Sequence, residues 1–333
     1  MPYLQKAVAI SDRSSIGEAR RAASAVARSL GFDEGRCSDI SIVATELATN
    51  ILLHGGKGEL LICPVEAGSI WLDLLALDTG PGIREVSRAF EDGVSTAGSA
   101  GQGLGAVKRL SDTVSLYSVA GAGTAVFCRF GLLSGREAEP LGVVSIPLHG
   151  ETECGDSYFV LPGARRSLFM MVDGLGHGPV AAQAATEAVK VVMDSTQESL
   201  SEIMTLTHNA LKATRGAAMA IARVDHERSV ATYAGVGNIS ASIGNGAITR
   251  NMVSRNGTLG AVLPKVQEYA YPFEPSMKLL MFSDGLISKC SLSGYPGILN
   301  RPPALIAGLL YRDFSRRRDD ATVLVASLNG GLR

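Results

Sequence analysis

Apolar residues in the first third of the chain recur every three or four positions, at the spacing of one helix face. The pattern predicts a helix over 38–53, with Ser38 as the residue that caps its start. The apolar positions of this face are Ile40, Val43, Leu47 and Ile51.

Elsewhere the apolar residues form short continuous runs, which predict buried strands. These strands are expected at 70–77, 124–130, 168–172, 217–224, 230–234, 278–282 and 321–326. Further helices are expected at 106–110, 179–194 and 199–214. A polar, charged stretch at 134–140 separates the two halves, so we predict domains at 1–133 and 145–330 joined by a linker at 134–144. The fold class is therefore α/β (α+β) with two domains.

Acidic residues stand at the ends of several predicted strands in the second half. Carboxylates from distant parts of the sequence can then meet at one rim of a sheet, and Mg²⁺ and Mn²⁺ prefer such oxygen ligands. An Asp-Gly pair is also an ordinary turn, so one pair alone has no such meaning. The candidate ligands are Asp156, Asp173, Asp284, Asp319 and Asp320.

Three segments of this half, 171–182, 282–286 and 319–325, resemble the bacterial SpoIIE-type branch of the PPM (type 2C) protein phosphatases. The resemblance covers roughly 144–328 and implies an αββα sandwich. It also implies two Mn²⁺ or Mg²⁺ ions and phosphoserine or phosphothreonine substrates.

The same resemblance implies roles for single residues. Asp173 would bridge the two metals and Gly174 would offer its carbonyl, with Asp284 and Asp319 as further ligands. Asp156 would lie at or just behind the metals. Asp320 is a weaker candidate, since usually one of the adjacent pair binds. Phe159 stands where many relatives carry a further acid, which puts a third metal in doubt.

Glu46 and Asn50 in the first half are four residues apart, so they share one face of the predicted helix. Taken alone, they are typical of a solvated helix surface. Two glycine-rich segments change this interpretation, because glycines let backbone N–H groups approach phosphate. One segment contains Asp78, Gly80 and Gly82, and the other contains Gly101, Gly103, Leu104 and Gly105.

In this order the motifs resemble the GHKL (Bergerat) ATP-binding fold, in the branch of anti-sigma-factor and switch serine kinases. The resemblance covers roughly 5–131 and implies an α/β sandwich that binds ATP and Mg²⁺. Glu46 would activate the attacking hydroxyl, Asn50 would hold Mg²⁺, and Asp78 would accept from the adenine amino group. Gly80 and Gly82 would make room for the base. The lid over the phosphates would be formed by Gly101, Gly103, Leu104 and Gly105.

Bulk composition narrows the function classes. The 333 residues carry a formal net charge of −1, which predicts no general attraction to nucleic acid or to an anionic membrane. Five scattered cysteines without a Cys-x-x-Cys pair fit reduced thiols in the cytoplasm. No apolar run approaches the ~18–20 residues that cross a bilayer, and the first residues do not resemble a signal peptide.

The two resemblances together predict a bifunctional regulator of bacterial partner switching. Its first domain would phosphorylate, and its second would dephosphorylate, Ser or Thr of STAS-domain proteins, either stressosome scaffolds or anti-sigma antagonists. A sigma factor and a downstream phosphatase are further candidate partners. In the alternative hypothesis the chain is a phosphatase whose ATP domain senses nucleotide or binds a partner.

Overall fold

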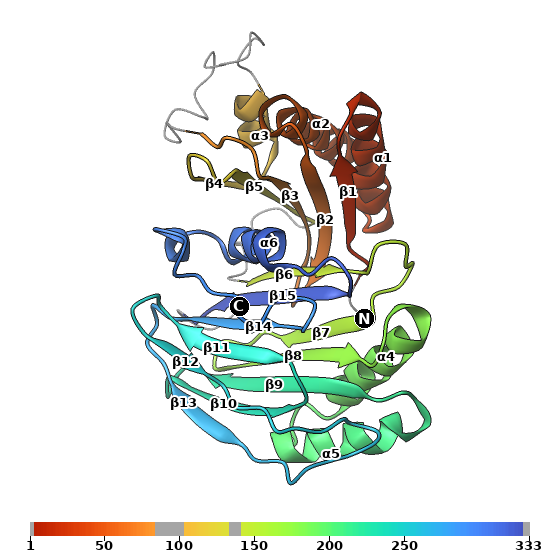
Figure 1. Ribbon diagram of the computed structural model, residues 1–333, viewed down its shortest axis with the longest axis vertical. Coiled ribbons are helices and arrows are strands. Elements are labelled where there is room, and N and C mark those ends of the chain that lie inside the picture. Colours follow the sequence, from red (N-terminus) through yellow and green to blue (C-terminus); the bar gives the residue numbers. More distant parts are fainter. Residues whose placement is uncertain (1–2, 84–102, 133–140, 329–333) are drawn as a thin grey trace. The chain divides into compact units, whose positions relative to one another are not determined.

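The computed structural model describes residues 3–83, 103–132 and 141–328. The chain divides into two compact units, 5–138 and 139–333, with the first four residues counted in the second. Each unit has its own sheets and helices, which are labelled in Figure 1.

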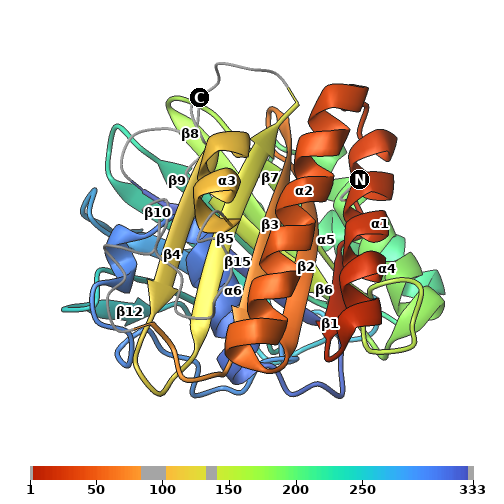
Figure 2. The same cartoon turned by 90° about the horizontal axis from the view of Figure 1, so that it is seen from above.

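The first unit contains one five-stranded antiparallel sheet in the order β1-β2-β3-β5-β4. Its strands are β1 (Lys6–Ile10), β2 (Gly58–Glu66), β3 (Ile70–Asp78), β4 (Thr113–Ser118) and β5 (Thr124–Gly131). The helices cover one face of this sheet (Figure 2). They are α1 (Arg13–Ser29), α2 (Glu34–Asn50) and α3 (Gly103–Leu110).

Helix α2 begins earlier than its apolar pattern predicts. Asp33 is the residue that caps it, because its carboxylate accepts a hydrogen bond from the Arg36 amide at 2.8 Å. The predicted cap, Ser38, is wrong: it lies inside the helix and donates its hydroxyl to the Glu34 carbonyl at 2.9 Å. After Asn50 the chain widens into a π-helical turn, η1 (Ile51–Gly55).

The second unit contains two five-stranded antiparallel sheets, in the orders β13-β10-β9-β8-β7 and β12-β11-β14-β15-β6. The first sheet is built from β7 (Asp156–Leu161), β8 (Arg166–Gly174), β9 (Ala217–Asp225), β10 (Val230–Val236) and β13 (Tyr269–Pro272). The second is built from β6 (Leu141–Ile146), β11 (Ser240–Gly244), β12 (Thr249–Asn251), β14 (Lys278–Phe282) and β15 (Ala321–Ser327).

Helices flank these sheets. The helices α4 (Gly178–Asp194) and α5 (Leu200–Ala210) pack on the first sheet. The alanines and valines of α4, with Leu200, Ile203 and Met204 of α5, share a core with β8, β9 and β10. The helix α6 (Pro303–Phe314) packs on β6 and β15 of the second sheet. Short 3₁₀ turns lie at η3 (Leu211–Ala213) and η4 (Ile298–Asn300). The arrangement is a β-sandwich flanked by helices.

The predicted linker overlaps a strand. Its last four residues, 141–144, belong to β6 and pair with β15, with Val144 opposite Val323. These residues are buried and apolar, so they fit a sheet rather than a linker. The preceding residues of the linker prediction, 134–140, lie outside the described part of the chain.

Candidate active sites

Acidic residues from both sheets of the second unit gather at one end of the sandwich. Asp156 begins β7 and stands directly opposite Asp173, near the end of β8. Asp284 follows β14, and Asp319 and Asp320 immediately precede the neighbouring strand β15. The two sheets therefore bring together all five predicted acids.

A hydrogen-bond network fixes Asp156 across the sandwich. The hydroxyl of Ser283 donates to Asp156 Oδ2 at 2.6 Å. The same hydroxyl accepts from the Thr322 amide at 3.1 Å, and the Ser283 amide donates to the Thr322 carbonyl at 3.0 Å. Ser283 therefore ties Asp156 to the end of β14 and to β15 of the other sheet, a role that the sequence motif did not reveal.

Asp320 holds two neighbouring backbone segments. Its Oδ1 accepts from the Leu148 amide at 2.8 Å and its Oδ2 accepts from the Gly155 amide at 2.9 Å. Gly155 directly precedes Asp156, so Asp320 positions the first acid. The adjacent Asp319 is half-buried and accepts from the Asp320 amide at 3.0 Å.

The carboxylates are crowded enough to change their protonation. Burial, followed by the charges of Asp156, Asp284 and Asp319, raises the pKa of Asp173 to about 9. Burial also raises the pKa of Asp156 to about 7. Asp284 accepts from Asn238 Nδ2 at 2.8 Å, and burial, followed by the charge of Asp319, raises its pKa. The cluster cannot hold all its negative charges without protons or cations.

These residues fit hard divalent cations by their chemistry. All the donors are oxygens, and a cation would supply the positive charge that the cluster lacks. Among the described residues, no three His, Cys, Asp or Glu side chains stand close enough together, as oriented here, to hold a metal ion. Asp156 and Asp320 instead point to Ser283 and to backbone amides.

Gly174 is placed beside the acids by close backbone packing. Its amide donates to the Gly155 carbonyl at 3.0 Å, and a Cβ here would collide with the Ala181 carbonyl of α4. His177 in the following loop bonds through Nδ1 to Glu151 Oε1 at 2.7 Å, so its side chain shapes the loop. Phe159 packs against the core of the first sheet.

In the first unit, helix α2 and the start of α3 bring three predicted residues together. A Cβ placed on Gly103 would lie 2.8 Å from Glu46 Oε2 and 3.9 Å from Asn50 Oδ1. The Asn50 amide nitrogen is buried and has no hydrogen-bond partner among the described residues. A glycine cradle beside an unpartnered amide fits a nucleotide phosphate with its cation.

Asp78 sits at the end of β3 within a ring of glycines. Its Oδ1 accepts from the Gly80 amide at 2.9 Å and from the Thr124 amide at 3.2 Å. A Cβ on Gly55, at the end of η1, would lie 2.5 Å from the Asp78 Cβ. Gly82 and Gly123, both with positive φ, approach backbone carbonyls too closely for any Cβ. Neither Gly55 nor Gly123 was predicted from the sequence.

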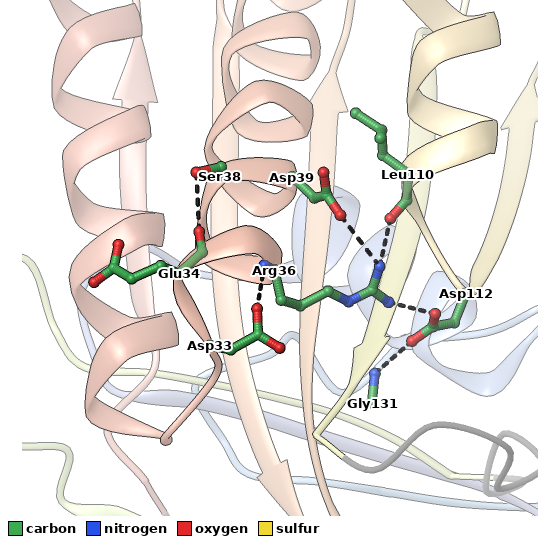
Figure 3. A network of polar contacts seen from close by, with 8 residues as sticks. All are labelled: Asp33, Glu34, Arg36, Ser38, Asp39, Leu110, Asp112 and Gly131. Carbon is green, nitrogen blue, oxygen red and sulfur yellow. Dashed lines mark hydrogen bonds and ion pairs between the residues drawn. The ribbon is translucent and has the colours of Figure 1, made fainter.

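A polar network joins the beginning of α2 to the end of α3 (Figure 3). The Arg36 guanidinium donates to the Leu110 carbonyl at 2.8 Å and pairs with Asp112. Asp112 in turn accepts from the Gly131 amide at 2.7 Å. This network fixes α3, and with it Gly103, against the helix that carries Glu46.

Of the other residues predicted to bind the phosphates, two lie in the described part of the chain and one does not. Leu104 and Gly105 lie in the first turn of α3, and Gly105 is buried. Gly101 lies outside the described residues. His54, four residues after Asn50, lies in the π-helical turn and is exposed.

Two families match these two units. The histidine kinase-like ATPase domain matches residues 10–130, and the stage II sporulation protein E (SpoIIE) family matches residues 163–329. The chain therefore belongs to the SpoIIE family and carries, ahead of that domain, a histidine kinase-like ATPase domain.

Two individual relatives are similar to one unit each. The serine/threonine-protein kinase RsbT of Bacillus subtilis (strain 168) is 43% identical over 123 residues, which are 37% of this chain and 92% of RsbT. The phosphoserine phosphatase RsbX of the same organism is 25% identical over 145 residues, which are 43% of this chain and 73% of RsbX. Both resemblances predicted from the motifs are thus confirmed: an RsbT-like kinase domain is fused to an RsbX-like phosphatase domain.

Solved structures agree with the fold. One, described as "The bacterial stressosome: a modular system that has been adapted to control secondary messenger signaling", has a TM-score of 0.53 and 29% identity. It covers 57% of this chain and 100% of its own. RsbX in complex with magnesium has a TM-score of 0.50 and 23% identity, covering 60% of this chain and 98% of its own, and shows the fold alone.

The families imply ATP for the first unit and divalent metal ions for the second. Among the helices of residues 3–83, 103–132 and 141–328, none is long and apolar enough to cross a membrane.

Proposed function

We propose that this chain is a bifunctional regulator that phosphorylates and dephosphorylates Ser or Thr of STAS-domain proteins in bacterial stress signalling. The main support for this proposal is that one chain contains both sites. These are the glycine cradle formed by Gly103 beside Glu46 and Asn50, and the crowded acidic cluster around Asp173. The similarity to RsbT and RsbX, and to a stressosome structure, supports partners of this class. The cytoplasm is the proposed location.

In the kinase unit, Glu46 would take the proton from the attacking hydroxyl, which must approach beside Gly103. Asn50 would hold Mg²⁺, which neutralises phosphate charge during transfer. Asp78 would accept from the adenine amino group, with Gly80 and Gly82 leaving space for the base. The amides of Gly101, Gly103, Leu104 and Gly105 would bind the phosphates.

In the phosphatase unit, Asp173, Asp284 and Asp319 would hold two Mn²⁺ or Mg²⁺ ions together with the Gly174 carbonyl. Such ions, when bound, would supply a water that ionises near neutral pH and would neutralise charge on the phosphate. Asp156 is held by Ser283 beside Asp173. Asp320 stays a predicted ligand, although each of its oxygens already accepts a backbone hydrogen bond, and we assign it first to positioning Gly155.

The test is phosphate transfer from labelled ATP to STAS-domain proteins encoded beside the gene. We expect weak labelling with the wild type, stronger labelling with Asp173→Ala, and none with Glu46→Ala. This order would place both activities on one substrate. Absence of labelling in every variant, with ATP binding confirmed, would contradict the kinase assignment and favour a nucleotide-sensing or partner-binding domain.

A further inference from the structure

The outer face of the sheet β12-β11-β14-β15-β6 is covered by a helix over only part of its width. A Cβ on Gly142 of β6 would collide with Ala304, so this face of β6 lies against α6. Val325 of β15 pairs with Gly142 and therefore points to the same side. Over β14, β11 and β12 the covering chain is the segment around residues 288–299.

A cavity of about 560 Å³ lies between this segment and the sheet. The strand β11 presents only small residues to it, namely Ser240, Ala241, Ser242 and Gly244, and this leaves the space open. Polar side chains add Asn251 from the neighbouring strand β12 and Ser254 from the segment that follows it. The volume falls in the range of protein pockets that bind ligands of a few hundred Å³ or more.

The lining of the cavity carries positive charge without a counter-charge. Two lysines, Lys278 and Lys289, line it, and among the described residues that line it there is no Asp or Glu. Lys278 is half-buried, and its Nζ donates to Ser327 Oγ at 2.8 Å. Its neighbour on β11 is Gly244, which has no side chain to cover the ammonium. Burial lowers the pKa of Lys278, and no carboxylate offsets this effect.

The cavity adjoins the acidic cluster. Asn238, which lines the cavity, donates to Asp284 Oδ2 at 2.8 Å. Phe282, which also lines it, is two residues before Asp284 on the same strand end. A chain segment whose phosphorylated residue lies at the acidic cluster could therefore place its neighbouring residues in the cavity.

We propose that this cavity is a specificity subsite for acidic side chains that flank the phosphorylated residue of the protein substrate. Lys278 stands six positions before Asp284 along an extended strand, so it pairs with a substrate carboxylate several residues away from the phosphorylated one. The hydroxyl of Ser242, on the same face of the neighbouring strand, adds a hydrogen bond to that carboxylate. The inference rests on the proposed phosphatase function and adds the class of substrate sequence. Lys278 is a specificity residue and takes no part in the chemistry.

The experiment compares phosphoserine peptides that carry Asp or Asn at each flanking position, with p-nitrophenyl phosphate as a substrate that lacks flanks. We expect the wild-type full chain to favour one Asp position about tenfold in kcat/KM, mainly through KM. Lys278→Gln should remove this preference and leave p-nitrophenyl phosphate turnover unchanged. Lys278→Arg should keep the preference, and Lys278→Glu should reverse it toward a Lys-flanked peptide.

The matched control is Lys212→Gln, which removes an exposed lysine that does not line the cavity and should leave the preference intact. The proposal is overturned if the wild type does not distinguish Asp from Asn peptides, or if Lys278→Gln slows all substrates equally. If no substrate is turned over, the proposed function fails. In that case the subsite is tested by equilibrium binding of the Asp and Asn peptides. Tighter binding of the Asp peptide by the wild type, but not by Lys278→Gln, would support it.

Discussion

The two candidate sites are built in opposite ways. The phosphatase site depends on buried and crowded charge: Asp156 and Asp173 face each other across two strands, and burial together with the other acids raises the pKa of Asp173. The kinase site depends on missing side chains: Gly103 lies against Glu46, and Gly55 lies against Asp78. One site should therefore be most sensitive to a changed charge, and the other to an added methyl group.

The largest expected effect is at the charged site. Asp173→Asn should lower phosphatase kcat by at least about 10³-fold, because metal ions supply several kcal/mol of catalysis and each ~1.4 kcal/mol is tenfold. Calorimetric titration with Mn²⁺ should show weakened binding. Autonomous ATP binding by the first unit should persist.

The control for this change is Asp225→Asn, since Asp225 is an acid at the far end of β9 whose partners are Arg166 and Arg228. Equal loss of phosphatase activity in both variants would mean that the effect comes from folding rather than from the charged cluster.

The next effect is at the glycine site. Gly103→Ala should lower kinase activity by about 10²-fold, because the added Cβ displaces Glu46 and small displacements of catalytic groups have effects of this size. Phosphatase activity should be unchanged. The measurement is the initial rate of labelled phosphate transfer.

Gly17→Ala is the matched control, because a Cβ there meets only the flexible end of Arg21 at 3.2 Å within helix α1. It should stabilise the helix by roughly 0.5–1 kcal/mol and leave transfer unchanged. If both glycine variants are fully active, missing side chains do not define the kinase site.

A pH titration should sharpen the contrast between the sites. An unfolded Asp ionises near ~3.9, whereas the pKa of folded, metal-free Asp173 is raised to about 9. Between these values the folded state binds more protons, so unfolding free energy should fall as pH rises. Denaturant unfolding in chelator should show this slope, and Asp173→Asn should flatten it. An equally steep slope in the variant would contradict crowding at Asp173.

The smallest expected effect comes from Arg36→Gln. The Arg36 and Asp112 side chains are 21% and 49% exposed, so solvent screens their ion pair. The free energy of unfolding should therefore fall by only about 1 kcal/mol. Because this pair fixes α3, the KM for ATP should rise a few-fold while kcat is kept. Arg28→Gln, which removes a more exposed pair with Glu34, should change neither.

The sequence was informative where an acidic residue stands at the end of a predicted strand. Asp173, Asp284 and Asp319 were identified because each borders an apolar run, and the sheets bring them together. The partner of Asp156, Ser283, gave no such signal, because its contact joins residues 127 positions apart in the chain. The cap at Asp33 was missed because Ser38 stands nearer the apolar pattern.

The glycine site was predicted only in part for a related reason. Gly80 and Gly103 belong to local motifs, whereas Gly55 and Gly123 approach Asp78 only through the fold. The π-helical turn after Asn50 also has no marker in the apolar spacing, which predicts a regular helix through residue 53. The spacing of residues along the chain predicts which ones are candidates for a site. The tertiary fold decides which of these candidates come into contact.

The pairing of Asp156 with Asp173 has a consequence for the assembly of the protein in the cell. Strand β7 is at the edge of its sheet, and a shift by one residue would turn Asp156 to the opposite face. At the proposed metal site the ions would then lose the negative charge of this neighbouring carboxylate, so they would favour the correctly aligned hairpin over its misaligned forms. Metal ions present during synthesis should thus select chains with the correct strand register. Scarcity of metal should lower the yield of correctly folded chains.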